Sequence, residues 1–290
     1  VHYAIPHAFA GYMARKMLLE DGIYLPIVTT LHGTDITLVG KHPHYKTAVT
    51  FSINKSDYVT SVSESLKKDT YEHFDIKKDI YVIPNFIEVE EKQQKSQHHC
   101  FRSNMAMPEE RIITHISNFR AVKRIADVVK TFYNIQKVIP AKLMMVGEGP
   151  EKTKAEELCR ELGIDDKVIF FGNSLDVNQI LNYSDLFLLP SESESFGLAA
   201  LEAMACKVPV ISSNAGGLGE VNVQGESGFL SNVGDVEDMA KNALHILKDN
   251  ETLEKFRYNA FERAKVFNIN TILPMYLDIY EKAISNRKSV

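Results

Sequence analysis

The stretch Glu194-Ser-Phe-Gly-Leu-Ala-Ala-Leu-Glu202 decides the fold, because a strand precedes it and a helix continues from it. The apolar run before it, Asp185-Leu-Phe-Leu-Leu-Pro190, predicts a buried parallel strand. The Ala-, Leu- and Met-rich run that follows, as far as Cys206, predicts a helix. Two carboxylates therefore flank the start of a helix at the carboxyl end of a strand, where open α/β sheets bind their ligands.

The start of this helix predicts a site for a phosphate or a developing negative charge. The N–H groups of Phe196, Gly197 and Leu198 would lack helical partners, and Gly197 would let a ligand approach the backbone closely. Glu194 and Glu202 would accept hydrogen bonds from sugar hydroxyls on either side of that anion. On the spacing alone, the alternative is an exposed helix with solvated glutamates. The combination favours a nucleotide-sugar ligand.

The sequence after this helix favours the functional interpretation. The segment Pro209-Val-Ile-Ser-Ser-Asn-Ala-Gly-Gly-Leu-Gly-Glu220 predicts a short strand that ends in a glycine-rich turn. A strand, a loop, a helix, a second strand and a Gly-Gly turn, in that order, are typical of the phosphate-binding half of a Rossmann-like sheet.

Length and composition indicate a globular protein of two domains. The chain has 290 residues, of which 44% are hydrophobic and 24% charged. No apolar run approaches the roughly 20 residues of a membrane span, so we expect no stable membrane insertion. The net charge of −5 argues against a nucleic-acid partner. Three scattered cysteines fit a reducing, cytoplasmic environment better than a disulfide framework.

The sequence predicts no metal site. The tract His98-His99-Cys100 contains metal-binding residue types, but no second ligand pair stands at the spacing of a zinc finger. We expect this tract to belong to a solvated linker.

Alternating strands and helices predict an α/β fold of two parallel, doubly wound sheets. Residues 88–103 are polar and poor in apolar side chains, which is typical of a linker between domains. We place a first domain at residues 1–98 and a second at residues 99–271. Strands are expected at residues 26–31, 58–62, 80–85, 112–116, 141–146, 168–172, 185–190 and 209–213.

A basic turn, Ser117-Asn-Phe-Arg-Ala-Val-Lys-Arg124, follows the first strand of the second domain. A guanidinium at Arg120 and an ammonium at Lys123 are suited to stabilise the two charges of a diphosphate leaving group. The alternative for this turn alone is a solvated basic surface. Gly147 and Gly172 end two strands on the same edge of the sheet, and we expect them to leave room for a base or ribose.

In the first domain, His32-Gly-Thr-Asp35 follows a predicted strand. A histidine there would hydrogen-bond a sugar hydroxyl or move a proton, with Asp35 close enough to fix its tautomer. A purely structural histidine is the alternative. Tyr3 and Thr30 are further polar groups at strand ends in this domain.

These motifs together resemble the retaining glycosyltransferases of family 4, which have the GT-B fold. The five motifs, found in the expected order over nearly the whole chain, are His32-Gly, Arg120-x-x-Lys123, Gly147-Glu-Gly-Pro150, Glu194-x7-Glu202 and Gly216-Gly217. The resemblance implies two Rossmann-like domains that face a cleft, with the last helix, at about residues 272–290, returning to the first domain. It also implies a nucleoside diphosphate sugar as donor substrate and no metal or other cofactor, because basic side chains take the metal's place.

The same resemblance assigns roles to individual residues. Glu202 would hold the ribose and Glu194 the sugar hydroxyls, while Arg120 and Lys123 would hold the diphosphate. The remaining donor-binding residues would be Asn118, Gly147, Gly172, Ser174, Phe196, Gly197 and Leu198. The catalytic set would be Arg120, Lys123, Glu194 and His32.

Several segments resemble one branch of this family, which uses UDP-N-acetylglucosamine as donor and L-malate as acceptor in bacillithiol biosynthesis. The segments are His2-Tyr-Ala-Ile-Pro-His7, Thr29-Thr-Leu-His-Gly-Thr-Asp-Ile-Thr37, Ser52-Ile-Asn-Lys-Ser-Asp57 and Val233-Gly-Asp-Val236. A small dianionic acceptor needs several hydrogen-bond donors, and the expected ones are Tyr3, Thr30, His32 and Asn118.

Two departures from the family pattern shape our expectations. Family members begin with a strand and a glycine-rich loop, whereas this chain begins at Val1 without them, so we expect a first domain that is incomplete at its amino-terminal end. After the Gly-Gly turn, Leu218-Gly219 replaces the usual branched or proline-containing stretch, and we expect this to loosen the loop.

Three other functions stay open, and so does the oligomeric state, with a homodimer among the options. The first alternative is a transferase with a lipid or polysaccharide acceptor, the second is a nucleotide-sugar epimerase, and the third is a nucleotide-sugar-binding remnant without activity. A lipid acceptor favours a basic amphipathic helix, yet residues 10–19 carry only Arg15 and Lys16. An epimerase would need carboxylates or histidines for chemistry at C2 in place of Arg120 and Lys123.

Overall fold

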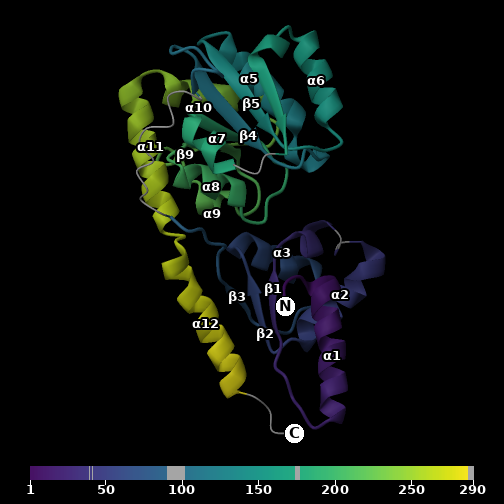
Figure 1. The fold of residues 1–290 in the computed structure, drawn as a ribbon. Coiled ribbons are helices and arrows are strands. Elements are labelled where there is room, and N and C mark those ends of the chain that lie inside the picture. Colours follow the sequence, from purple (N-terminus) through teal and green to yellow (C-terminus); the bar gives the residue numbers. More distant parts are fainter. Residues whose placement is uncertain (39, 41, 90–101, 174–176, 287–290) are drawn as a thin grey trace. The chain divides into compact units, whose positions relative to one another are not determined.

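The computed structural model describes residues 1–38, 40, 42–89, 102–173 and 177–286 (Figure 1). The chain forms two compact units. Val1–Phe86 and Phe267–Val290 make up the first, and Ile87–Val266 makes up the second. The boundary predicted between residues 98 and 99 lies outside the described residues. The one predicted between residues 271 and 272 falls inside the last helix, α12 (Ile269–Ser285).

A six-stranded parallel sheet forms the centre of the second unit, with the strand order β6-β5-β4-β7-β8-β9. The strands are β4 (Arg111–Ile116), β5 (Ala141–Val146), β6 (Val168–Gly172), β7 (Leu186–Leu189), β8 (Val210–Ser213) and β9 (Gly228–Ser231). The sequence predicted all of these except β9. A Cβ at Gly228 would lie 1.8 Å from the carbonyl oxygen of Val210, so a glycine lets this short edge strand pair with β8.

Helices cover both faces of this sheet (Figure 1). They are α5 (Ile125–Gln136), α6 (Lys152–Glu161), α7 (Val177–Tyr183), α8 (Leu198–Ala205), α9 (Leu218–Val221), α10 (Val236–Leu247) and α11 (Asn250–Lys265), with short 3₁₀ helices η3 (Ala121–Lys123) and η4 (Asp165–Lys167). The larger core lies between one face and α5, α6, α10 and α11. The smaller core lies between the other face and α7. The doubly wound α/β fold predicted from the sequence is confirmed.

The first unit contains a parallel sheet of three strands, β1 (Val28–Leu31), β2 (Tyr58–Ser61) and β3 (Ile80–Val82). An isolated parallel bridge joins His2 to Thr30, next to β1. The helices are η1 (Ala4–Ala8) and η2 (Thr34–Leu38), which are π-helical, α1 (Phe9–Glu20), α2 (Pro43–Lys55), α3 (Glu64–His73) and α12. The predicted cap of α3 is confirmed, since the Ser63 hydroxyl accepts a hydrogen bond from the Leu66 amide at 3.0 Å.

Helix α12 packs on the sheet of the first unit. Ile272, Tyr276 and Ile279 bury their side chains with Ile83 in one apolar cluster. The helix predicted near the end of the chain therefore belongs to the unit that also contains the amino terminus. Among the described residues, no helix has both the length and the apolar character needed to cross a membrane.

Candidate functional site

Three loops of the second unit meet at the carboxyl ends of neighbouring strands β4, β7 and β8. Backbone hydrogen bonds join them. The Glu192 amide donates to the Val122 carbonyl at 2.8 Å, and the Gly217 amide donates to the Glu194 carbonyl at 2.9 Å. The parallel sheet therefore brings together segments that lie far apart in the sequence.

Lys123 and Glu194, two of the predicted catalytic residues, are in direct contact. The Lys123 ammonium forms an ion pair with Oε1 of Glu194, and the two side chains are 21% and 14% exposed. The Ser191 hydroxyl donates to the same oxygen at 2.9 Å. Because the pair is shielded from water, its attraction is stronger than that of a surface pair. Ser191 was not predicted, since a serine in a Ser- and Glu-rich loop carries no distinguishing signal.

Asn118 and Arg120 project from the loop after β4 into solvent. No described residue forms a hydrogen bond or ion pair with either side chain. The Arg120 guanidinium stays charged at any physiological pH and can donate two parallel hydrogen bonds to an anion. The loop that carries Lys123 thus also presents an available, solvent-exposed cation.

The start of α8 has the geometry expected of an anion site. Gly197 is its N-cap at a φ of +99°, a backbone conformation that favours glycine. Within the described ranges, the Gly197 and Leu198 amides donate to no other residue, whereas Phe196 is buried and makes its own contacts. The Glu202 carboxylate is half-buried with no hydrogen-bond partner among the described residues, and burial raises its pKa.

The Gly-Gly turn supports the Glu194 loop. Gly216 has a φ of +56°, and a Cβ on it would lie 1.9 Å from the Glu194 carbonyl oxygen. Leu218 is fully buried and begins α9. The leucine anchors the turn in the core, and the expectation that Leu218-Gly219 loosens this loop stays a prediction.

The predicted glycines at the ends of β5 and β6 lie close to other parts of the protein itself. A Cβ on Gly147 would lie 1.8 Å from the Ser117 carbonyl oxygen, and one on Gly172 would lie 3.0 Å from a Glu148 carboxylate oxygen. Gly147 thus lets the loop after β5 pack under the loop after β4. The contact of Gly147 and Gly172 with a base or ribose stays a prediction, and Ser174 lies outside the described residues.

A buried histidine, His115 on β4, lies behind this site. Its Nδ1 bonds the Leu188 carbonyl of β7 and its Nε2 bonds the Ser117 hydroxyl, each at 2.8 Å. The pKa of His115 is lowered to about 4: burial is the main cause, the Leu188 hydrogen bond partly opposes it, and the nearby Lys123 charge adds to the lowering. The imidazole is therefore neutral at pH 7. Sequence reasoning does not select this residue, since a lone histidine in an apolar strand is most often structural.

This histidine predicts a fall in stability on acidification. Its pKa in the folded state, about 4, is below the ordinary 6.5, so between these pH values only the unfolded chain takes up a proton. The stabilising effect is complete above pH 6.5 and disappears as the pH falls to 4, a loss of about 3 kcal/mol. Urea unfolding of the wild type and of His115→Phe at pH 7 and pH 4.5 measures it. Equal pH dependence in the two proteins would contradict the assignment.

In the first unit, Tyr3 and His32 lie together as predicted, with His2 as a third member. The rings of Tyr3 and His32 have centroids 4.9 Å apart. Nδ1 of His2 and Nε2 of His32 are joined by a hydrogen bond of 2.8 Å, in which one ring donates and the other accepts. Burial, with a smaller contribution from the neighbouring His2, lowers the pKa of His32 to about 4. Both rings are neutral at pH 7 and can exchange donor and acceptor roles.

Two predictions about this group need correction. Asp35 does not set the tautomer of His32, because its carboxylate accepts hydrogen bonds from the Ala4 and Gly33 amides while the His32 ring pairs with His2. The Thr30 hydroxyl is fully buried and accepts a hydrogen bond from Thr60 at 2.9 Å, so its predicted contact with an acceptor would require these bonds to rearrange.

A pocket of about 550 Å³ opens beside this group. Tyr3, Pro6, Phe9, Asp35 and Tyr45 are among the residues that line it. The lining is mainly apolar, and its one charged group is a carboxylate. That carboxylate belongs to Asp35, and burial raises its pKa.

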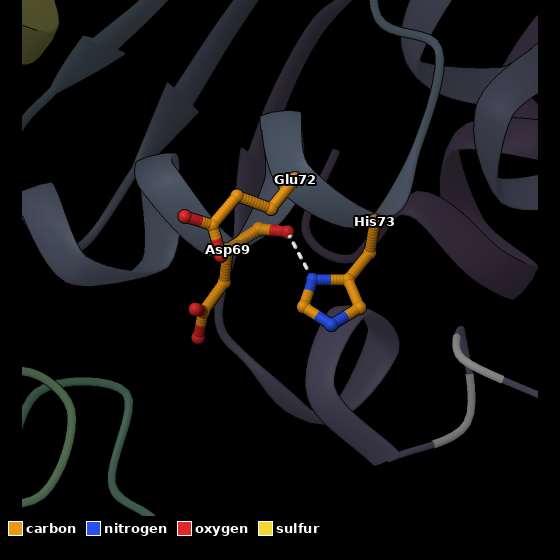
Figure 2. Close-up of side chains that lie close together, drawn as sticks. All are labelled: Asp69, Glu72 and His73. Carbon is orange, nitrogen blue, oxygen red and sulfur yellow. Dashed lines mark hydrogen bonds between the residues drawn. The ribbon is translucent and has the colours of Figure 1, made fainter.

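A group of possible metal ligands lies on α3 of the first unit. Figure 2 shows Asp69, Glu72 and His73 side by side, with the His73 Nδ1–H donating to the Asp69 carbonyl at 2.7 Å. Side chains three and four residues apart are neighbours on any helix, and the Glu72 side chain is exposed, so we assign no metal to this group. The tract His98-His99-Cys100 lies outside the described residues.

Helix α1 is less basic at its surface than its sequence suggests. Arg15 is buried, where it forms an ion pair with Asp57 at 2.7 Å and donates to the Lys55 carbonyl. Only Lys16 of the two predicted basic residues faces solvent. This helix therefore lacks the positive face that a membrane-surface helix needs.

Comparison with known proteins places these features in a family. Residues 100–263 match the family model "Glycosyl transferases group 1", and residues 1–91 match "Glycosyltransferase Family 4". The chain is 42% identical to N-acetyl-alpha-D-glucosaminyl L-malate synthase of Bacillus anthracis, over 100% of this chain and 75% of that protein. It is 32% identical to a sulfoquinovosyl transferase of Arabidopsis thaliana, over 55% of this chain and 31% of that protein.

Solved structures share the fold at low sequence identity. The Anabaena protein HepE, in complex with UDP-glucose, superimposes with a TM-score of 0.84 at 20% identity and covers 95% of this chain and 76% of its own. Sucrose-phosphate synthase from Thermosynechococcus elongatus gives 0.83 at 21% identity, over 98% and 73%. With two parallel α/β units, matching family models and a relative that is 42% identical, this chain belongs to the family-4 glycosyltransferases of the GT-B fold.

Proposed function

We propose that the protein transfers N-acetylglucosamine from UDP-N-acetylglucosamine to the hydroxyl of L-malate, with retention of the anomeric configuration. The observation that carries the proposal is the Lys123–Glu194 ion pair just before the start of α8, together with the exposed Arg120 guanidinium on the loop that also carries Lys123. It occurs in a chain that is 42% identical, over its full length, to a protein named for this reaction.

On this proposal the donor binds to the second unit. Arg120 and the free amides at Gly197 and Leu198 hold the diphosphate, and the unpartnered Glu202 carboxylate accepts the ribose hydroxyls. Glu194 accepts hydroxyls of the sugar, and Lys123 stays close to both Glu194 and the breaking bond. These basic groups supply the positive charge that a metal ion supplies in other transferases, so we propose a metal-independent reaction.

The proposed chemistry occurs on one face of the sugar. The bond between the anomeric carbon and the phosphate oxygen breaks, and a bond from that carbon to the malate hydroxyl oxygen forms on the same face. The hydroxyl proton moves to the departing phosphate oxygen, so that UDP leaves as the charge on its phosphate is shared with Arg120 and Lys123. Within the first unit, Tyr3 and His32 are the proposed hydrogen-bond donors to malate, and the contribution expected of Asn118, in the second unit, stays a prediction.

The test measures UDP release from UDP-N-acetylglucosamine. We expect release with L-malate and none with succinate, which has the same two carboxylates but no hydroxyl to accept the sugar. The proton–proton coupling at the anomeric position of the product reports retention. UDP binding is measured alongside by calorimetry. A chain that binds UDP but releases none with malate would contradict the acceptor and favour a lipid or polysaccharide instead.

A further inference from the structure

The hydrogen bonds around His115 have only one consistent arrangement. A carbonyl oxygen can only accept, so Nδ1 donates its proton to Leu188 and Nε2 of the neutral ring must accept. The Ser117 hydroxyl therefore donates to Nε2. Its oxygen in turn accepts a hydrogen bond from the Phe119 amide at 3.3 Å. A directed chain thus runs from the Phe119 backbone to β7, the strand that leads to the Glu194 loop.

The residue at the start of this chain has an uncommon backbone conformation. Phe119 has a φ of +32°, which costs free energy in a residue with a side chain. Its ring is fully buried and stacks on His115, with centroids 6.1 Å apart and planes inclined by 28°. The Phe119 carbonyl accepts a hydrogen bond from the Glu151 amide at 3.0 Å. Both backbone polar groups of Phe119, its amide and its carbonyl, are therefore held by hydrogen bonds, which offsets the strain.

The conformation of Phe119 decides where its neighbours point. Ser117 and Phe119 face the interior, whereas Asn118 and Arg120, which alternate with them, project into solvent. A Phe119 in the ordinary negative-φ region would turn the backbone and change the direction in which Arg120 projects. The placement of the exposed guanidinium therefore depends on a partly buried hydroxyl and a buried imidazole.

We propose that His115 and Ser117 are positioning residues for the donor, which hold the turn at Phe119 so that Asn118 and Arg120 meet the diphosphate. The inference rests on the proposed function, in which Arg120 binds that group. This positioning role differs from a role in stability alone, because His115 and Ser117 would affect donor binding only by placing Arg120.

A double-mutant cycle tests this dependence. The dissociation constant of UDP is measured for the wild type, Ser117→Ala, Arg120→Ala and the double variant. We expect Ser117→Ala to weaken binding about five- to tenfold in the wild type and less than about twofold when Arg120 is already absent, because interacting residues are not additive. His115→Phe, which keeps an aromatic ring in the stack, should behave as Ser117→Ala does.

Thr114→Val is the matched control. Thr114 is a neighbour of His115 on β4, with a buried hydroxyl that bonds Ser184 at 2.6 Å on the other face of the sheet. We expect it to lower the urea midpoint and leave UDP affinity unchanged. The inference would be overturned if the losses of UDP affinity in the two single variants multiply in the double variant. It would also be overturned if Ser117→Ala leaves UDP affinity unaltered. If Arg120→Ala alone leaves UDP affinity unchanged, the proposed role of Arg120 fails first and the inference fails with it.

Discussion

Lys123→Ala is expected to lower kcat about 100- to 1000-fold while the dissociation constant of UDP-N-acetylglucosamine changes less than about tenfold. In the free protein the Lys123 ammonium is already neutralised by Glu194, so it has little charge left to attract a resting donor. When the glycosidic bond breaks, negative charge builds up on the phosphate beside it. The ammonium then stabilises the transition state more than the ground state. Single-turnover rates and calorimetry separate the two effects.

Lys154→Ala is the control for this experiment. Lys154 belongs to the same unit and forms an ion pair with Glu151 at 2.9 Å, but its side chain is 72% exposed. Exposed pairs contribute little, so both constants should stay at the wild-type values. If affinity and rate fall by equal factors in Lys123→Ala, the lysine stabilises the bound donor and the transition state equally, which would contradict this prediction.

Gly216→Ala is expected to destabilise the second unit by about 3–5 kcal/mol and to abolish most activity. The added methyl group would overlap the Glu194 carbonyl oxygen, at 1.9 Å, and a backbone atom cannot rotate away as the end of a side chain can. The loop that carries Glu194 would have to move. Urea unfolding gives the stability, and UDP release gives the activity.

Gly225→Ala separates this overlap from the cost of the backbone conformation. Gly225 has a φ of +75°, close to the +56° of Gly216, but nothing lies within 4 Å of the position that its Cβ would take. Its substitution should cost only the left-handed conformation, about 1–2 kcal/mol. If the two alanine variants are equally stable, the close packing of the Gly-Gly turn on Glu194 does not matter to the fold.

Strands with strong apolar signals were predictable, and weakly marked elements were not. β5 and β6 have the bounds expected from their apolar runs, Ala141–Val146 and Val168–Gly172. Strand β9 has four residues and begins with a glycine, and α2 is mostly polar, so neither stands out from a loop in the sequence. Elements of this kind form because their neighbours in the fold complete them.

The site likewise has one part that could be predicted from the sequence and one part that could not. The topology of a parallel sheet brings the carboxyl ends of its strands to one edge, so the meeting of Lys123 and Glu194 could be expected from order along the chain alone. The hydrogen bonds could not. Contacts such as those of Ser191 with Glu194 or His2 with His32 depend on loop conformations, in which a shift of less than an ångström makes or breaks a hydrogen bond.

The division of the first unit into two separate stretches has a consequence for its synthesis on the ribosome. Residues 87–266 are continuous, so the second unit can fold as soon as its own sequence has emerged. The first unit is translated earlier, yet Ile83 meets Ile272, Tyr276 and Ile279 only after the last helix has left the exit tunnel. The part of the protein that is made first is therefore the part that is finished last. Until then its apolar surface is open to chaperones.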